Sequence, residues 1–301
     1  MALDSAPEYP EFRRVTLEDQ AWVSTLFERY PTELSERTFA SLFVWREYQD
    51  RSLVSRLDDH LMISWRREKL GRIMLPPVGA NPIGVIERIA NPKPFEKLQF
   101  GGVIGLVEPL VSGLRARGLH VESLRDEWDY VYLREDLVKL EGPKYHTQRK
   151  EMNKATSAKR LQYQPITKEL IGQCLDLQEV WCDLKNCTMD RLSNAEDSAL
   201  KEALLNFDSL GLLGGVVTVD DKVQALTIGE KLNRDTAVVH FEKANPSIRG
   251  LYQVINQQFC EHGLRGFEFV NREQDVGEPG LRRAKEGYHP DHFVEKHFLS
   301  L

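Results

Sequence analysis

Apolar and polar positions in the first half of the chain follow helical spacing in some segments and extended spacing in others. The segment 17–30 is preceded by Thr16, a residue that often caps a helix, and has Glu18 and Asp19 in its first turn. Both features are typical of the start of a helix. Polar breaks such as Asp58-Asp59 separate short apolar segments and favour hairpins between strands. These patterns predict helices over 17–30, 35–45, 82–91 and 109–118, and strands over 52–57, 61–66, 71–75 and 128–133.

The second half of the chain repeats this arrangement. Asp220-Asp221 joins two apolar segments and is a hairpin signal. Because both halves combine helices and strands in a similar order, we predict an α+β fold class with two domains, over 1–140 and 141–301. Helices are expected over 144–156, 168–184, 195–207 and 250–262, and strands over 161–164, 211–219, 222–230, 236–242, 266–270 and 293–298.

Composition excludes several classes of protein. Hydrophobic residues make up 41% and charged residues 29% of the chain, which is typical of a folded domain, and the net charge of -6 argues against a nucleic-acid coat. The longest weakly apolar run, 100–111, contains Glu108 and Pro109 and is shorter than the ~20 residues of a membrane span. The first residues lack the apolar core of a secretory signal. We therefore expect a cytoplasmic protein without a membrane span.

Cysteine and glycine patterns give no cofactor signature. The four cysteines form no Cys-x-x-Cys pair and are interpreted as reduced thiols, and no metal site is expected. Residues 100–105 are rich in glycine but lack the Gly-x-Gly-x-x-Gly spacing of a dinucleotide loop. That segment is interpreted as a turn.

A basic segment lies between the two halves. Residues 139–160 contain seven Lys or Arg and two Glu, against the acidic average of the chain. On a helix, Tyr145, Arg149 and Asn153 fall at i, i+4 and i+8 and share one face. The face is either that of a solvated linker helix or a polar wall that receives an anion, for which arginine is well suited.

A second candidate lies where a helix follows a strand. The strand over 236–242 ends at Glu242, and the next helix begins near Arg249-Gly250. The N-terminus of a helix offers free N–H groups and a partial positive charge, and can hold a phosphate.

The third candidate is the charged excursion over 271–290. Asn271, Glu273, Gln274 and Asp275 leave the end of a predicted strand. A short basic helix with Arg282 and Lys285 follows, between Pro279 and Gly287. It is either a salt-bridged surface excursion or an active-site wall, since it places acids that accept a proton beside cations that hold an anion.

The order of elements resembles the acyltransferase fold of the GNAT superfamily, in which a mixed, mostly antiparallel sheet parts between its fourth and fifth strands and admits the acyl donor. The resemblance implies two such domains in tandem. It also places Arg249-Gly250 at the turn that holds the pyrophosphate of acetyl-CoA. The second small residue of that turn is absent here, and Tyr252 would crowd a close backbone approach, which weighs against acetyl-CoA.

Motifs along nearly the whole chain resemble the phosphatidylglycerol lysyltransferase C-terminal domain family. They are WDYVY at 128–132, LEGPKYH at 140–146 with Arg149 and Asn153, NREQD at 271–275, GLR at 280–282, Lys285 and YHP at 288–290. The resemblance implies kinship with enzymes that move an aminoacyl group from charged tRNA. The long membrane portion of the full-length lipid enzymes has no counterpart in this sequence.

These observations lead to one main functional hypothesis and one alternative. The main hypothesis is an aminoacyl- or acyltransferase that uses a charged tRNA or an acyl thioester as co-substrate, requires no cofactor and forms no stable nucleic-acid complex. An amine or a hydroxyl would be the acceptor. The alternative is a non-enzymatic GNAT-derived module that binds a small anionic metabolite. The candidate catalytic residues are Glu273, Asp275 and Glu242; the candidate binding residues are Tyr145, Arg149, Asn153, Arg249, Asn271, Gln274, Arg282, Lys285 and Tyr288.

Overall fold

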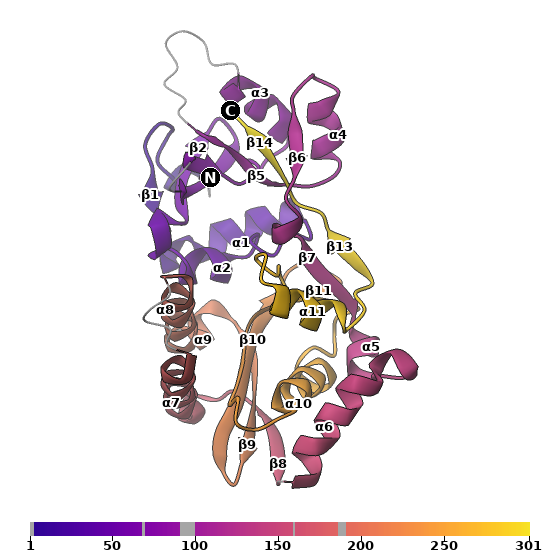
Figure 1. The fold of residues 1–301 in the computed structure, drawn as a ribbon. Coiled ribbons are helices and arrows are strands. Elements are labelled where there is room, and N and C mark those ends of the chain that lie inside the picture. Colours follow the sequence, from indigo (N-terminus) through magenta and orange to yellow (C-terminus); the bar gives the residue numbers. More distant parts are fainter. Residues whose placement is uncertain (1–2, 68–69, 91–99, 159, 186–190) are drawn as a thin grey trace. The chain divides into compact units, whose positions relative to one another are not determined.

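The computed structural model describes residues 3–67, 70–90, 100–158, 160–185 and 191–301. It forms two compact units (Figure 1), unit 1 being Met1–Asp129 with Val294–Leu301 and unit 2 Tyr130–Phe293. The expected ranges were 1–140 and 141–301. The units differ from these ranges at the junction and at the C-terminus, because the last residues of the chain join the first sheet.

Unit 1 is built on a seven-stranded sheet with the order β1-β2-β3-β4-β5-β14-β6. Strands β4 and β5 are parallel, and β14 is antiparallel to both β5 and β6. The strands are β1 (Arg13–Arg14), β2 (Leu53–Leu57), β3 (His60–Arg67), β4 (Gly71–Met74), β5 (Gly102–Leu106), β6 (Val121–Ser123) and β14 (His297–Ser300); the α-helices are α1 (Gln20–Arg29), α2 (Phe39–Val44), α3 (Pro82–Ala90) and α4 (Leu110–Arg115).

The core of unit 1 follows from the apolar faces of these elements. Met62, Met74 and Val103 on three strands are fully buried and pack with Ile86 and Val111 from helices α3 and α4. Burial of this apolar surface is the main favourable term in folding. The helix expected over 17–30 starts as the 3-10 turn η2 (Leu17–Asp19), around which Thr16 and Asp19 form a capping box, and continues as α1 from Gln20.

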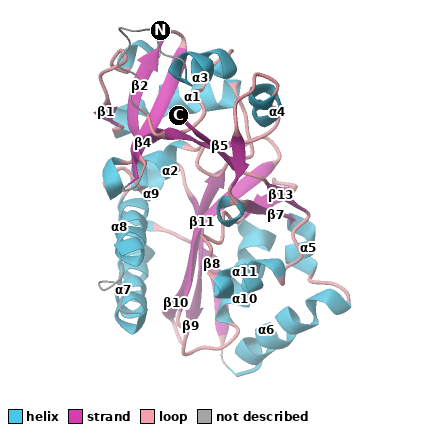
Figure 2. Ribbon diagram, turned by 45° about the horizontal axis from the view of Figure 1, so that its top comes forward, coloured by secondary structure: helices cyan, strands magenta, loops and turns pink. Residues whose placement is uncertain are grey.

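Unit 2 is built on a second seven-stranded sheet with the order β13-β7-β12-β11-β10-β9-β8. Figure 2, like Figure 1, shows α7 and α8 on one side of the long strands, and α10 with α6 on the other. The strands are β7 (Asp129–Leu133), β8 (Leu161–Pro165), β9 (Leu213–Val219), β10 (Lys222–Lys231), β11 (Thr236–Ala244), β12 (Phe269–Asn271) and β13 (His292–Val294). The helices are α5 (Arg134–Lys139), η5 (Pro143–Tyr145), α6 (His146–Ala158), α7 (Lys168–Lys185), α8 (Arg191–Leu205), α9 (Phe207–Leu210), α10 (Leu251–Gln258), η7 (Phe259–Gly263) and α11 (Pro279–Glu286).

The sheet of unit 2 parts between β11 and β12. The two strands are parallel and pair only over Thr236–Val238 and Phe269–Asn271. Strand β11 continues to Ala244, and among the described residues nothing pairs with its residues 239–244 on that edge. The polar residues from Asn271 onward therefore leave the sheet next to strand β11, which continues past the point where its pairing with β12 ends.

Several predicted elements were wrong in extent or type. The helix expected over 35–45 begins only at Phe39, because the Thr38 side chain accepts from the Ser41 N–H and caps it there. The turn expected over 100–105 is largely strand β5, where Gly102 packs directly against the ring of Phe298. The single strand expected over 293–298 is two strands, β13 and β14, which belong to different sheets. Across the described residues, no helix combines the length and the apolarity that crossing a bilayer requires.

Candidate active site

A buried histidine lies between two carboxylates in unit 2. The Nδ1 of His240 lies 2.7 Å from Glu273 Oε1, and its Nε2 lies 2.9 Å from Glu230 Oε1. Burial by itself would lower the pKa of His240, but the two carboxylates outweigh it and raise the pKa to about 10. The ring is therefore an imidazolium at neutral pH, and we call His240, Glu230 and Glu273 the imidazolium cluster.

A β-bulge orients His240. In the pairing of β10 with β11, Ile228 lies opposite Phe241 and Gly229 opposite Val239, so His240 is the extra residue. Gly229 is required at this point, because a Cβ there would lie 2.2 Å from the carbonyl oxygen of Val238. The bulge thus places an ionisable side chain at the level where β11 loses its partner β12.

Glu273 is held in a backbone conformation that side chains rarely adopt. Its φ is 57°, in the left-handed region, which costs of order 1 kcal/mol for a residue with a Cβ. The Asn271 side chain accepts from the Glu273 N–H at 2.8 Å, and the Lys285 ammonium donates to the carbonyls of Arg272, Glu273 and Gln274. This fixed loop aims the Glu273 carboxylate at His240, and 24% of that side chain is exposed.

Asp275 is placed differently. It is fully buried, with its two oxygens accepting from Arg282 at 2.8 Å each and a further bond from the Tyr130 hydroxyl. Burial favours the neutral acid, but Arg282, Tyr130 and the Gly277 N–H together hold the pKa of Asp275 well below its usual range. Of the two acids proposed in the loop, Glu273 is the one accessible to a substrate.

A second cluster surrounds the buried guanidinium of Arg272. Its Nη2 donates to Glu242 at 3.1 Å, and the rings of Tyr132 and Tyr288 lie 5.7 and 4.9 Å from its Cζ. Burial opposes the charge, but Glu242 and the surrounding phenols raise the pKa of Arg272 above its usual value. Asn256 on α10 donates to the other oxygen of Glu242. We call these five residues the guanidinium cluster.

Several polar atoms near these clusters are buried without a hydrogen-bond partner among the described residues. They include Nη1 of Arg272, Oδ1 of Asn256, Oε1 of Gln274 and Oγ1 of Thr227. Buried polar groups are normally satisfied, because leaving one unpaired costs about 1–3 kcal/mol. Unpaired donors and acceptors at such a place can bind a polar ligand.

The predicted phosphate site at the start of α10 is occupied by the protein itself. Arg249 pairs with the carboxylate of Glu151 on α6, which also accepts from Lys154 at 2.7 Å. These hydrogen bonds lower the pKa of Glu151 to about 2. A Cβ on Gly250 would lie 2.0 Å from the Glu151 carbonyl oxygen, so α6 packs closely against the N-terminus of α10.

The predicted face of α6 meets the C-terminal excursion in part. The Tyr145 hydroxyl lies 3.1 Å from the Tyr288 carbonyl oxygen and 3.2 Å from Asp136 Oδ2 and shares its one proton between them, which joins two segments far apart in the sequence. Arg149 turns back to the carbonyls of Leu140 and Gly142. Asn153 is exposed to solvent.

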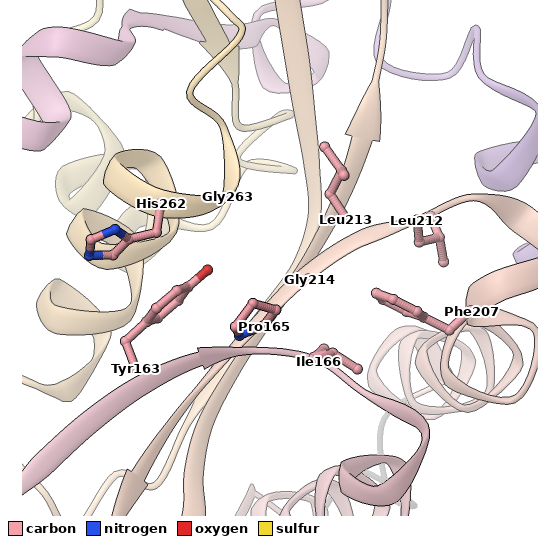
Figure 3. Close-up of a pocket in the computed structure, with 9 residues that line it drawn as sticks. All are labelled: Tyr163, Pro165, Ile166, Phe207, Leu212, Leu213, Gly214, His262 and Gly263. Carbon is pink, nitrogen blue, oxygen red and sulfur yellow. The ribbon is translucent and has the colours of Figure 1, made fainter.

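An apolar hollow lies elsewhere in unit 2. Its volume is about 200 Å³, and Figure 3 shows Tyr163 and Pro165 of β8, Phe207 of α9, Leu213 of β9 and His262 of η7 among the residues that line it. None of the residues that line it belongs to the imidazolium or guanidinium cluster. The hollow is therefore separate from the polar site.

Some site residues were not among the sequence candidates: His240, Glu230, Arg272, Asn256, Tyr130 and Tyr132. The signal for His240 was the polar interruption of the apolar strand VVHFE at 238–242, where His240 and Glu242 replace residues that pack a core. Arg272 lies within the NREQD motif at 271–275 but was not assigned a role, and Glu230 and Asn256 carry no such local mark.

With this geometry in place, comparison with known proteins identifies the family. The model of the family described as phosphatidylglycerol lysyltransferase, C-terminal, matches residues 27–299. The chain belongs to this family. A conserved protein of unknown function from Bacteroides thetaiotaomicron VPI-5482 is 32% identical, with a TM-score of 0.87, over 96% of this chain and 99% of that one. Among proteins of curated function, no sequence match was found.

Two more distant structures establish the fold. L-PGS from Bacillus licheniformis has a TM-score of 0.61 at 11% identity, over 92% of this chain and 90% of that one. A tandem GNAT protein from the clavulanic acid biosynthesis pathway has a TM-score of 0.52 at 11% identity, over 96% and 98%. The predicted fold class, α+β with tandem GNAT-like domains, is confirmed.

Proposed function

We propose that the protein is an aminoacyltransferase whose reaction centre is the imidazolium cluster of unit 2. The observation that carries the proposal is the family match over residues 27–299. The parted sheet and the orphaned polar atoms beside it support the location. The donor would be an aminoacyl ester of tRNA, and the acceptor an amine or a hydroxyl.

In this reaction Glu273 would act as the general base. The lone pair of the acceptor nitrogen or oxygen attacks the donor carbonyl carbon, and Glu273 takes the proton of the acceptor. When the tetrahedral intermediate collapses, the ester C–O bond breaks and the proton returns to the leaving oxygen. His240, as an imidazolium with 3% of its side chain exposed, would position Glu273 and stabilise its charge.

The start of α10 supports an ester donor over a coenzyme A thioester. A pyrophosphate at that helix end would meet the Glu151 carboxylate, which already holds Arg249, and the α6 backbone against Gly250. An anion placed beside a fixed carboxylate is repelled. Opening this end would require α6 to separate from α10.

The alternative, a sensor of an anionic metabolite, receives less support from unit 2. Its candidate cations are engaged within the protein: Arg282 with Asp275, Lys285 with three carbonyls, Arg149 with two carbonyls and Arg249 with Glu151. An anion in their place would have to displace these internal acceptors.

The test uses purified protein with two donor pools in parallel. One pool is total tRNA charged with labelled amino acids, and the other is a set of acyl-CoA thioesters assayed by release of free thiol. We expect the label to be transferred from tRNA to an added amine or hydroxyl acceptor, and we expect this transfer to depend on Glu273. No thiol should be released from the acyl-CoA pool. Thiol release without loss of label from tRNA would contradict the proposed ester donor and would show that the donor is an acyl-CoA thioester.

Glu273→Gln is expected to lower turnover by about 10²-fold or more, because removal of a positioned base has effects of that size. Glu278→Gln is the matched control, since Glu278 lies in the same excursion and its side chain is exposed. Equal turnover by the two variants would contradict the assignment of Glu273.

A further inference from the structure

Unit 1 contains a guanidinium surrounded by aromatic rings. The Cζ of Arg51 lies 5.5 Å from the ring of Trp45, 5.4 Å from that of Tyr48 and 5.6 Å from that of Trp65. Trp45 caps the C-terminus of helix α2, Tyr48 begins the 3-10 turn η3 (Tyr48–Asp50), Arg51 follows that turn, and Trp65 comes from strand β3. We call these four residues the Arg51 cage.

Two N–H donors of the cage have no acceptor. Nε of Arg51 and Nε1 of Trp65 are both buried and lack a hydrogen-bond partner within the described part of the chain. Trp65 is only 8% exposed, while Arg51 as a whole keeps partial exposure to solvent. Cation–π contacts with three rings stabilise the charge but satisfy none of these donors.

The carboxylates near Arg51 form ion pairs with other cations. Glu36 accepts from Lys296 at 2.7 and 2.8 Å, and Glu127 pairs with Arg67 at 2.5 Å. Both carboxylates act on Arg51 through space and partly offset its burial, while Arg67 adds a second positive charge nearby. Burial prevails and lowers the pKa of Arg51 below its usual value.

Other buried arginines of this protein are compensated more fully. Arg272 donates to Glu242, and its pKa is raised. Arg37 in unit 1 has a lowered pKa, as Arg51 does, but its Nη2 donates to the carbonyl of Tyr30 at 3.1 Å. Among the described residues, Arg51 has an aromatic enclosure without an acceptor of its own.

We propose that unit 1 carries an anion-binding site centred on Arg51, with Trp65 Nε1 as a second donor, which takes a carboxylate or a phosphate group. A planar guanidinium binds either group through two parallel hydrogen bonds. The rings of Trp45, Tyr48 and Trp65 exclude water and strengthen such bonds. This site lies in unit 1, whereas the proposed reaction centre lies in unit 2, and it stands whether or not unit 2 catalyses transfer.

The full-length protein would be titrated with sodium phosphate and, separately, with sodium acetate, at ionic strength held constant with sodium chloride. Tryptophan fluorescence is the readout, because Trp45 and Trp65 flank the guanidinium. We expect a saturable change with at least one anion, and the stronger of the two identifies the group that is recognised. Arg51→Gln should weaken binding by about tenfold or more, as expected for loss of a charge-assisted bidentate contact.

Arg29→Gln is the matched control, because it removes the same charge from an exposed residue whose guanidinium also lies over a tyrosine ring, 5.7 Å from that of Tyr30. It should bind as the wild type does. Trp65→Phe keeps a ring and removes only the indole donor, and should weaken binding several-fold. The proposal is overturned if neither anion gives a saturable change, or if Arg51→Gln melts like the wild type and binds as tightly. If Arg51→Gln does not fold, unchanged affinity in Trp65→Phe overturns it.

Discussion

At the scale of single residues, unit 2 depends on ionic groups that are buried and fully engaged. Lys285 and Asp275 organise the loop after β12, and His240 holds the carboxylate that the loop presents. Removing one member of such a buried pair lowers the stability of the fold strongly, because the other charge is left without a partner away from water. Two predictions follow from this arrangement.

The first concerns pH. The pKa of His240 is raised from its usual 6.5 to about 10 in the folded state, so its contribution to stability is fully present below pH 6.5. It should be lost progressively as the pH rises toward 10. Urea unfolding between pH 6 and 10 should show a steeper loss of stability for the wild type than for His240→Gln. Parallel curves for the two proteins would contradict the imidazolium assignment.

The second concerns Lys285, which is 8% exposed and donates to three successive carbonyls. Lys285→Met should lower the free energy of unfolding by about 3 kcal/mol, because charge-assisted hydrogen bonds are lost and buried carbonyls are left unpaired. Lys150→Met, at an exposed position on α6, should change it by less than about 0.5 kcal/mol. Chemical denaturation of both variants measures the difference.

The sequence indicated the charged loop but not its internal roles. It predicted that Glu273, Asp275, Arg282 and Lys285 lie together, since they are close along the chain. Which acid is buried depends on Tyr130, a residue 145 positions away from Asp275. Local pattern cannot reveal such a long-range pairing, whereas His240 carried a local signal, the polar interruption of the strand at 238–242, that was not used.

At the scale of elements, the contact of α6 with α10 determines what the helix end can bind. The sequence correctly predicted that a helix begins beside Gly250, but the backbone of α6 packs closely against this end of the helix. Gly250 has a φ of 89°, and a Cβ there would collide with the Glu151 backbone. A side chain is therefore excluded both by conformation and by space.

Gly250→Ala should accordingly destabilise the protein by roughly 2 kcal/mol or more, since a backbone carbonyl cannot move aside easily. Gly172→Ala in the middle of α7 is the matched control, because a Cβ there meets nothing within 4 Å. It should stabilise the protein by about 0.5–1 kcal/mol, as alanine favours a helix over glycine. Equal melting temperatures for the two variants would show that α6 does not pack against α10 as described.

At the scale of the whole molecule, the chain returns to its first sheet at its end. Strand β14 lies between β5 and β6, and Lys296 just before it contacts Asp129 at 2.7 Å and Glu36 at 2.7 Å. The sequence predicted a last strand but assigned it to the second domain. Residues 293–298 read FVEKHF, and the strand divides at the charged residues Glu295 and Lys296, while only the pairing partners reveal that its two parts belong to different sheets.

Removal of residues 294–301 should therefore unfold unit 1 although the cut lies at the end of the chain. Strands β5 and β6 would lose their shared neighbour, and the core would lose Leu299, which is 2% exposed. Asp129 would remain buried without its cation, a change that costs about 3–5 kcal/mol by itself. Unit 2 keeps all its elements except Val294 of the edge strand β13 and should keep its fold.

Amide hydrogen exchange on the chain that ends at Phe293 measures this outcome directly. We expect amides of β5 to exchange far faster than in the wild type, while those of β10 and β11 stay protected. Deletion of Leu301 alone, an exposed residue, is the control and should leave β5 protected. Protection of β5 in the truncated chain would mean that unit 1 folds without its C-terminal strand. Loss of protection in β10 as well would mean instead that the two units unfold together, so that the stability of unit 2 depends on the C-terminal segment that completes the sheet of unit 1.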